Sequence, residues 1–237
     1  PPIFNPNLKL NDSLIRIVQN KIQQQVNLNW HHAKMRYLYN KPHKNKDYIT
    51  AAYADLINSS KSEILILNSY FIASNQIREM LRNAARRGVN IKILTNAKEV
   101  TDNVFVSVAS RATYADLLKV NQEINNGGKL EIYEWQGHKI LNNNEGLHHA
   151  KYAIFDKRVV IVGSYNLDPR SRHINTECAV VIDSLELAQE LAQEFYSEIQ
   201  PNYSKNISLS EALKFSDPQD ILGRFEKEFV ESLKPML

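Results

Sequence analysis

The chain has 237 residues, a single cysteine, a hydrophobic share of 43% and a formal net charge of +3. At about 100–200 residues per domain, this length suits one large domain or one and a half and leaves little room for two complete domains. The lone Cys178 excludes an intramolecular disulfide and a cysteine-rich zinc site. The small net charge argues against a protein that coats a polyanion, and no stretch approaches the ~20 apolar residues of a transmembrane helix.

Hydrophobic periodicity and turn residues predict alternating helices and strands in the first half of the chain. In chain order we predict a helix capped by Asp12 and Ser13 with apolar positions from Leu14 to Val26, a connecting loop over Asn27–Asp47, a helix over Tyr48–Ser59, a buried strand over Glu63–Leu67, a helix that carries Ile77 to Ala85 and ends at Gly88, and a strand over Val89–Leu94. This alternation favours the α/β class.

The second half continues the alternation and ends in helices. In chain order we predict a helix over Tyr114–Ile124, a strand over Leu130–Trp135, a surface loop over Gly137–Gly146, a hairpin of strands Ala150–Phe155 and Val159–Ser164, a last strand over Glu177–Ile182, a helix over Leu185–Ile199 with Asp183 and Glu186 as its capping box, a short helix capped by Ser208 and Glu211, and an amphipathic helix from Ile221 to Leu233. The expected domains are an N-terminal helix and connecting segment (1–47), a central lobe (48–200) and C-terminal helices (201–237).

One group of polar residues in the predicted hairpin suits chemistry at a phosphate. His149, Lys151 and Asp156 have the spacing H-x-K-x4-D, and a Gly-Ser-x-Asn sequence containing Ser164 and Asn166 follows. Side chains alternate along a strand, so each pair two residues apart points to one face. An imidazole can attack phosphorus or protonate a leaving oxygen, and the other donors can hold the non-bridging oxygens. The Asp156 carboxylate can orient a histidine through a ring nitrogen.

This pattern resembles the phospholipase D superfamily, whose HKD motif is H-x-K-x4-D followed by G-S-x-N, and every fixed position is matched. The wider sequence from Gly163 to Glu177, with Ser69-Tyr70-Phe71 and Tyr133-Glu134-Trp135, is similar to the C-terminal half of bacterial cardiolipin synthases, closest to the C type. The resemblance covers roughly Tyr37 to the C-terminus. It implies a phospholipase D-like lobe, in which a mixed β-sheet is flanked by helices on both faces.

The resemblance also implies an activity, that of a phosphatidyltransferase that works through a phosphohistidine without metal or cofactor. It assigns catalysis to His149, Lys151 and Asp156, with His149 as the general acid and base. Ser164, Asn166, Glu177 and Tyr70 would bind phosphate or substrate, although Glu177 also fits a strand-end charge and Tyr70 a core or rim aromatic. The implied substrate is a phospholipid of the phosphatidylglycerol or phosphatidylethanolamine type, and the implied location is the periphery of a bacterial inner membrane.

Family members build one active site from two HKD motifs, and this chain contains one. The only comparable text, His32-Ala33-Lys34, has Tyr39 where the aspartate should stand. The partner motif is therefore expected either upstream of Pro1 or in a second copy of the chain. The sequence begins without an initiator methionine and resembles a C-terminal half, and both features favour an upstream lobe.

The main alternative is a single-motif homodimeric nuclease or phosphodiesterase of the same superfamily. The modest charge and the lack of an aromatic and basic stripe make a nucleic acid partner less favoured. Three further expectations concern neighbouring residues. His148 should face away from His149, Cys178 should be a core strand residue, and Arg170 and Arg172 fit either a second phosphate or a structural ion pair.

Overall fold

The computed structural model describes residues 32–125, 127–137 and 146–216. The predicted helices near residues 12–26 and 221–233 and most of the predicted loop 137–146 lie outside these ranges. The chain divides into two units, Pro1–His32 and Ala33–Leu237. Everything described below lies in the second unit.

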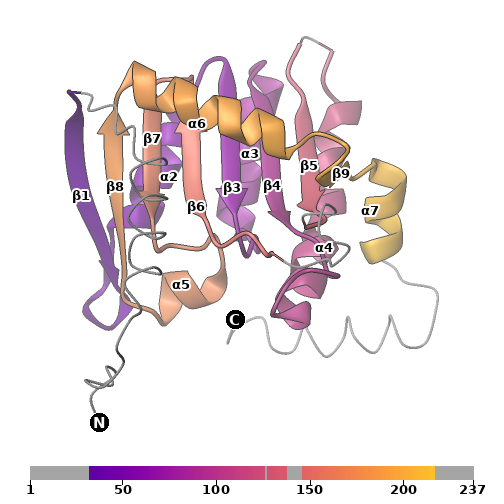
Figure 1. Ribbon diagram of the computed structural model, residues 1–237, viewed down its shortest axis with the longest axis horizontal. Coiled ribbons are helices and arrows are strands. Elements are labelled where there is room, and N and C mark those ends of the chain that lie inside the picture. The colour runs from indigo at the N-terminus through magenta and orange to yellow at the C-terminus, as the bar shows by residue number, and fades with distance from the viewer. Residues whose placement is uncertain (1–31, 126, 138–145, 217–237) are drawn as a thin grey trace, which may run out of the picture. The chain divides into compact units, whose positions relative to one another are not determined.

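The described strands form one mixed sheet in the order β2-β1-β8-β7-β6-β3-β4-β5-β9 (Figure 1). The strands are β1 (Lys34–Lys41), β2 (Lys46–Asp47), β3 (Glu63–Asn68), β4 (Asn90–Asn96), β5 (Leu130–Trp135), β6 (Lys151–Phe155), β7 (Val159–Gly163), β8 (Glu177–Asp183) and β9 (Ser204–Asn206). β3, β4 and β5 are parallel, and every other neighbouring pair is antiparallel. Helices connect the parallel strands, because a parallel pair needs a long crossover.

Helices lie on both faces of the sheet, as the resemblance implies (Figure 1). The helices are α2 (Tyr48–Ser59), α3 (Asn75–Arg86), α4 (Val104–Leu118), α5 (Pro169–His173), α6 (Leu185–Glu198) and α7 (Leu209–Ser216), with 3-10 turns η1 (Pro42–Lys44) and η2 (Lys119–Gln122). α2, α3 and α4 bury apolar side chains against one face, and α6 covers part of the other. None of the helices in the described ranges combines the length and the apolarity needed to cross a bilayer.

The strand β3 shows why the two faces are both apolar. Ile64 and Ile66 pack into the core beneath α2 and α3, whereas Leu65 and Leu67 pack into the core beneath α6. All four side chains are 0–1% exposed. A strand buried on both faces is a continuous apolar run rather than an alternating one, which is the pattern of Glu63–Leu67. The central strands are therefore held rigidly from both sides.

Several sequence predictions of the fold need correction. The predicted loop 27–47 contains β1, η1 and β2, so the sheet begins before residue 48. Met35, Tyr37 and Tyr39 recur at every second position, as on one face of a strand, but the apolar Leu38 breaks the alternation and the surrounding Lys, His and Asn residues obscure it. After β8 and α6 the chain adds one more strand to the sheet, β9. The helix α7 follows, and its Phe215 ring contacts the Tyr114 ring of α4. The sheet and its helices thus extend past residue 200.

Two helix starts also differ from the prediction. α4 begins at Val104 rather than Tyr114, because the Asn103 side chain accepts a hydrogen bond from the Val106 N–H and caps the helix. α6 is capped by Ser184, whose hydroxyl accepts from the Leu187 N–H, and not by Asp183. In contrast, the capping box of Ser208 and Glu211 at the start of α7 is confirmed.

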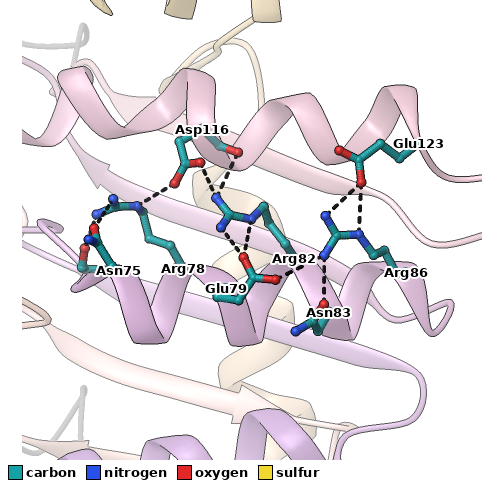
Figure 2. Close-up of polar contacts among 9 residues, drawn as sticks. Asn75, Arg78, Glu79, Arg82, Asn83, Arg86, Asp116 and Glu123 are labelled. Carbon is teal, nitrogen blue, oxygen red and sulfur yellow. Dashed lines mark hydrogen bonds and ion pairs between the residues drawn. The ribbon is translucent and has the colours of Figure 1, made fainter.

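A row of arginines joins α3 to the α4–η2 segment (Figure 2). Arg78, Arg82 and Arg86 recur every four residues on α3 and so lie on one side of it. Arg78 and Arg82 pair with Asp116, and Arg86 pairs with Glu123 at 2.8 Å. Exposed pairs of this kind stabilise by up to about 1 kcal/mol each. Their structural effect is to keep α4, with the loop before it, beside α3.

The glycine of the Gly-Ser-x-Asn sequence lies where two strands approach closely. A Cβ atom built on Gly163 would lie 2.1 Å from the Cys178 carbonyl oxygen and 2.6 Å from the Ala179 Cα, both of which are backbone atoms. No side-chain rotation can relieve such a contact. Gly163 therefore sets the spacing between β7 and β8 at the edge where Ser164 follows.

We predict that Gly163→Ala lowers the free energy of unfolding by about 3 kcal/mol or more, because the backbone of β8 has to shift. Gly127→Ala is the matched control. Its Cβ would meet no atom within 4 Å, and only its positive φ of 79° opposes the substitution, at about 1 kcal/mol. Urea unfolding of both variants checks the prediction, and equal losses would contradict it.

Candidate functional site

The predicted site residues gather where several strands begin or end. β3, β4 and β7 end at one edge of the sheet, and β6 and β8 begin there, at the lower edge in Figure 1. The register places Tyr152 opposite Val162 and Asn68 opposite Lys151. The residues just beyond these pairs therefore lie at the same edge, which we call the site edge. It carries His149, Lys151, Ser164, Asn166 and Glu177.

Lys151 lies at the start of β6 and is buried, with 7% of its surface exposed. Its Nζ donates to the Ser69 hydroxyl at 3.1 Å and to the His149 carbonyl at 2.8 Å. Burial lowers the pKa of the Lys151 ammonium, whereas the carboxylates of Glu177, Asp168 and Asp102 raise it, and the net shift is downward. A buried ammonium needs such partners, because desolvation is costly for an unpaired charge. This arrangement presents a cation at the site edge.

The backbone around His149 is held on both sides, while its side chain is exposed. The Asn96 side chain accepts from the His148 N–H at 2.9 Å and donates to the His148 carbonyl at 2.8 Å. The next carbonyl, that of His149, accepts from Lys151. The chain is thus fixed on either side of the His149 Cα, and the imidazole points from a rigid backbone toward solvent at the site edge.

Ser164 and Glu177 form a pair across β7 and β8. The Ser164 hydroxyl donates a short hydrogen bond to the Glu177 carboxylate. Glu177 is 8% exposed and also accepts from the Ser171 hydroxyl at 3.1 Å and from the Asn175 side chain at 3.0 Å. A buried carboxylate with three donors is fixed in place. Glu177 is therefore part of the site edge rather than a solvated strand-end charge.

The loop after Ser164 brings two further polar groups to this edge. Asn166 is half-buried, and its Oδ1 is buried without a hydrogen-bond partner in the described ranges. Such an orphaned acceptor is unusual in a folded protein, and a substrate hydroxyl or a water would satisfy it. Asp168 is 9% exposed and caps α5 through the Ser171 N–H at 2.7 Å. Burial, with Glu177 nearby, raises the pKa of Asp168 to about 6.

Tyr70 is linked to the site edge through Asp102. Its hydroxyl donates a short hydrogen bond to the Asp102 carboxylate, and that carboxylate acts electrostatically on Lys151. Burial, followed by this bond, raises the pKa of Tyr70. Asp168 acts electrostatically on both Tyr70 and Lys151. The Tyr70 ring packs against the small apolar cluster of Ile72, Val106 and Ala109, and its hydroxyl end meets Asp102.

Asp156 lies at the other end of β6, and the role expected for it needs correction. At about 3.3 Å per residue, five residues separate it from Lys151 by roughly 16 Å. Its carboxylate accepts from the backbone of Lys61, Ser62 and Glu63 and from the Ser62 hydroxyl. It therefore ties the hairpin turn to the start of β3 and is too far away to orient His149.

The backbone explains why an aspartate suits this turn. Asp156 and Lys157 both have φ of 52°, and the Arg158 N–H donates to the Phe155 carbonyl. Consecutive left-handed residues are typical of type I′ hairpin turns, in which Asp and Asn are favoured at the first position. Partial burial raises the pKa of Asp156, but the hydrogen bonds from Ser62, Glu63 and Lys61 outweigh it and lower the pKa overall.

We predict that Asp156→Asn, which also tolerates positive φ, lowers the free energy of unfolding by about 1–2 kcal/mol at pH 7, because the amide replaces a charged acceptor. The folded-state pKa of Asp156 is depressed, so its contribution is present above the unfolded value of about 3.9 and disappears as the pH falls below it. Unfolding measured from pH 7 to pH 3 should therefore show the two proteins converge in acid. A difference that stays constant with pH would contradict this role.

Three neighbouring predictions have mixed outcomes. His148 does face away, because its ring packs edge-on against Trp135 and its Nε2 lies 3.2 Å from a Glu198 carboxylate oxygen on α6. Arg172 lies 3.4 Å from the Asp47 carboxylate, so the ion-pair alternative describes it. Cys178 is exposed, and the prediction of a core residue is wrong, since the face of β8 that it occupies is not covered by α6.

Sequence reasoning missed Ser69, Asn96, Asp102, Asp168 and Ser171 as members of the site edge. Each lies directly after a strand or close to one in the chain, but a polar residue at a strand end is too common to indicate a site. Their relevance becomes visible only when β3, β4, β6 and β8 are placed side by side.

Residues 53–199 match the protein family described as "Cardiolipin synthase, PLD-like domain", which covers more than half of the chain. The chain belongs to this family. Cardiolipin synthase B of Salmonella typhimurium is 28% identical over 159 residues, which are 67% of this chain and 34% of that protein. The chain spans about a quarter to a third of the length of the curated relatives it matches.

Solved structures show the same fold. Phosphatidylserine synthase of Haemophilus influenzae Rd KW20 has a TM-score of 0.66 at 14% identity, over 98% of this chain and 56% of that chain. Nuc, a phospholipase D family member from Salmonella typhimurium, has a TM-score of 0.55 at 19% identity, over 74% of this chain and 99% of that chain. The α/β sheet with helices on both faces is therefore a phospholipase D-like fold.

Proposed function

We propose that this chain is the HKD-bearing lobe of a phosphatidyltransferase of the cardiolipin synthase type. The observation that carries the proposal is that the exposed His149 and the buried Lys151, whose ammonium bonds the His149 carbonyl, lie on an edge that also holds Ser164 and Asn166. A phosphodiester needs a proton donor for its leaving oxygen and cationic or neutral donors for its non-bridging oxygens. The site edge supplies both kinds of group.

In the proposed reaction a histidine of a second lobe attacks phosphorus, and the bond from phosphorus to the headgroup oxygen breaks. His149 gives its proton to that oxygen, and the headgroup alcohol leaves. His149 then takes the proton of a glycerol-type acceptor alcohol, whose oxygen attacks phosphorus and displaces the second-lobe histidine. Lys151 and Asn166 hold the non-bridging oxygens in both steps. Water as acceptor would give hydrolysis of the phospholipase D type.

Phospholipid substrates place the reaction at a membrane surface, and we propose peripheral attachment to a bacterial inner membrane. The cardiolipin synthase relatives support a phosphatidylglycerol-type donor. The net charge of +3 supports a lipid more than a nucleic acid partner. A phosphodiesterase acting on nucleic acid is therefore the second candidate, and the experiment below includes it.

We predict that the protein, together with its second lobe, converts phosphatidylglycerol vesicles to cardiolipin and glycerol. His149→Ala should reduce turnover by about a hundredfold to ten-thousandfold, because that is the usual contribution of a general acid and base. His43→Ala, which removes an exposed histidine in η1, is the matched control and should retain activity. Mass spectrometry of the lipids gives the measurement. Cleavage of DNA with no change in the lipids would overturn the proposal, and full activity of His149→Ala would overturn the site assignment.

A second lobe needs a place to bind, and the described residues leave one sheet face beside the site edge uncovered. Tyr37, Val180 and Val162 lie side by side across β1, β8 and β7. Tyr37 is 65% exposed and Val162 is 38% exposed. α6 packs on Val160 of the same face but does not reach Val162. Met35, two residues before Tyr37, is 69% exposed. We call Met35, Tyr37, Val162 and Val180 the open face.

The polarity of β1 supports a partner on the open face. Its aromatic and aliphatic side chains Met35 and Tyr37 point to this face, whereas Lys34 and Arg36 point to the other. An exposed apolar patch on a folded domain commonly marks an interaction site. The open face also runs into the site edge, since Gly163 and Ser164 follow Val162. We propose that the second HKD lobe, from a longer protein or a second copy, binds there.

We predict that Tyr37→Glu abolishes both lobe association and phosphatidyl transfer, because it buries a charge in the interface. Arg36→Glu, on the same strand but the opposite face, should retain both. Sedimentation velocity and transfer are measured on the same samples. A dimer that survives Tyr37→Glu would contradict the assigned face, and a fully active monomer would contradict the need for a second lobe. An inactive wild-type monomer points to the upstream lobe, and the two variants are then compared in the longer protein.

A further inference from the structure

The short helix α5 returns the chain to the site edge immediately after the Gly-Ser-x-Asn sequence. Its central residue, Ser171, is 1% exposed. Pro169 stands at the first helical position, and Asp168 caps the helix through the Ser171 N–H. Such a cap sets where the first turn begins. α5 therefore places the Ser171 side chain among residues that precede and follow it in the chain.

Three hydrogen bonds converge on Ser171 from three parts of the site edge. Its N–H donates to the Asp168 carboxylate at 2.7 Å. Its hydroxyl donates to the Glu177 carboxylate at 3.1 Å and accepts from the Asn166 N–H at 3.2 Å. Glu177 in turn accepts from Ser164. One serine thus links the start of β8 to the loop that follows β7.

We propose that Ser171 is a positioning residue that holds Glu177 and the Asn166–Asp168 loop in one arrangement at the site edge. The proposal extends the proposed function and rests on it for the kinetic consequences. Its hydroxyl bonds both Glu177 and the Asn166 N–H, and its backbone N–H bonds Asp168. Because these groups surround Lys151, a change in their spacing changes where the phosphate oxygens are held.

The same contacts couple Ser171 to protonation at the site. Burial raises the pKa of Asp168 to about 6, whereas the hydrogen bond from the Ser171 N–H lowers it. The titratable and charged groups that act electrostatically on Asp168, or on which it acts, are Glu177, Arg170, Lys151, Tyr70 and Tyr165.

Ser171→Ala is expected to reduce kcat on the order of tenfold to a hundredfold, because small misplacements of substrate-holding groups are costly, with little change in KM. Ser171→Thr, which keeps the hydroxyl, should recover most of kcat. Ser60→Ala is the matched control, because its buried hydroxyl bonds only to the Leu56 carbonyl and should change neither quantity.

Amide hydrogen exchange tests the same proposal without substrate. Ser171→Ala should speed exchange over residues 164–178 at least tenfold and leave α6 unchanged, whereas Ser60→Ala should leave residues 164–178 unchanged. If the wild-type protein has no activity on lipid, the proposed function is wrong, but hydrogen exchange over residues 164–178 still tests the positioning role of Ser171. Unchanged exchange over residues 164–178 in Ser171→Ala would overturn the positioning role, as would an unreduced kcat. If Ser171→Ala does not fold, the same two measurements on Ser171→Thr decide, with near wild-type values expected.

Discussion

The buried ammonium of Lys151 is the interaction on which the site depends. An ion taken out of water must be met by hydrogen bonds and opposite charge, or the fold loses several kcal/mol. Here Ser69 and the His149 carbonyl accept from it, and the carboxylates of Asp168 and Glu177 surround it. These partners come from β3, the entry to β6, the loop after β7 and the start of β8. The antiparallel placement of β6 between β3 and β7 is therefore a requirement of the site as well as of the sheet.

The HKD motif specifies both ends of one strand. His149 and Lys151 define the end of β6 at which a phosphate would be held, while Asp156 defines the turn at the opposite end and ties it to the entry of β3. A five-residue strand between them keeps the two ends about 16 Å apart. The fixed spacing of the motif thus reflects the length of a strand, and only two of its three named residues can contact one substrate.

Charge at the site edge is balanced rather than simply positive. Asp102, Asp168 and Glu177 lie close enough to Lys151 to favour its charged form, and Glu177 and Asp168 are themselves held by Ser171. A phosphate that binds Lys151 has to do so against these carboxylates, so the positions of the neutral donors matter. This requirement is the physical basis for the positioning role proposed for Ser171, a buried serine on a one-turn helix.

The sequence by itself determined the α/β class and the central strands, and it indicated that His149, Lys151, Ser164 and Asn166 lie at one edge of the sheet, because continuous apolar runs and a fixed motif spacing are local signals. It did not determine that β1 is a strand, since Met35 and Tyr37 are exposed in the described part of the chain and the pattern is diluted by charge. The sequence also did not indicate that Asp156 lies away from the site edge, or that Asn96, Asp168 and Ser171 lie at that edge. Those assignments depend on which strands are neighbours and on the direction in which each runs, and only the tertiary structure decides both.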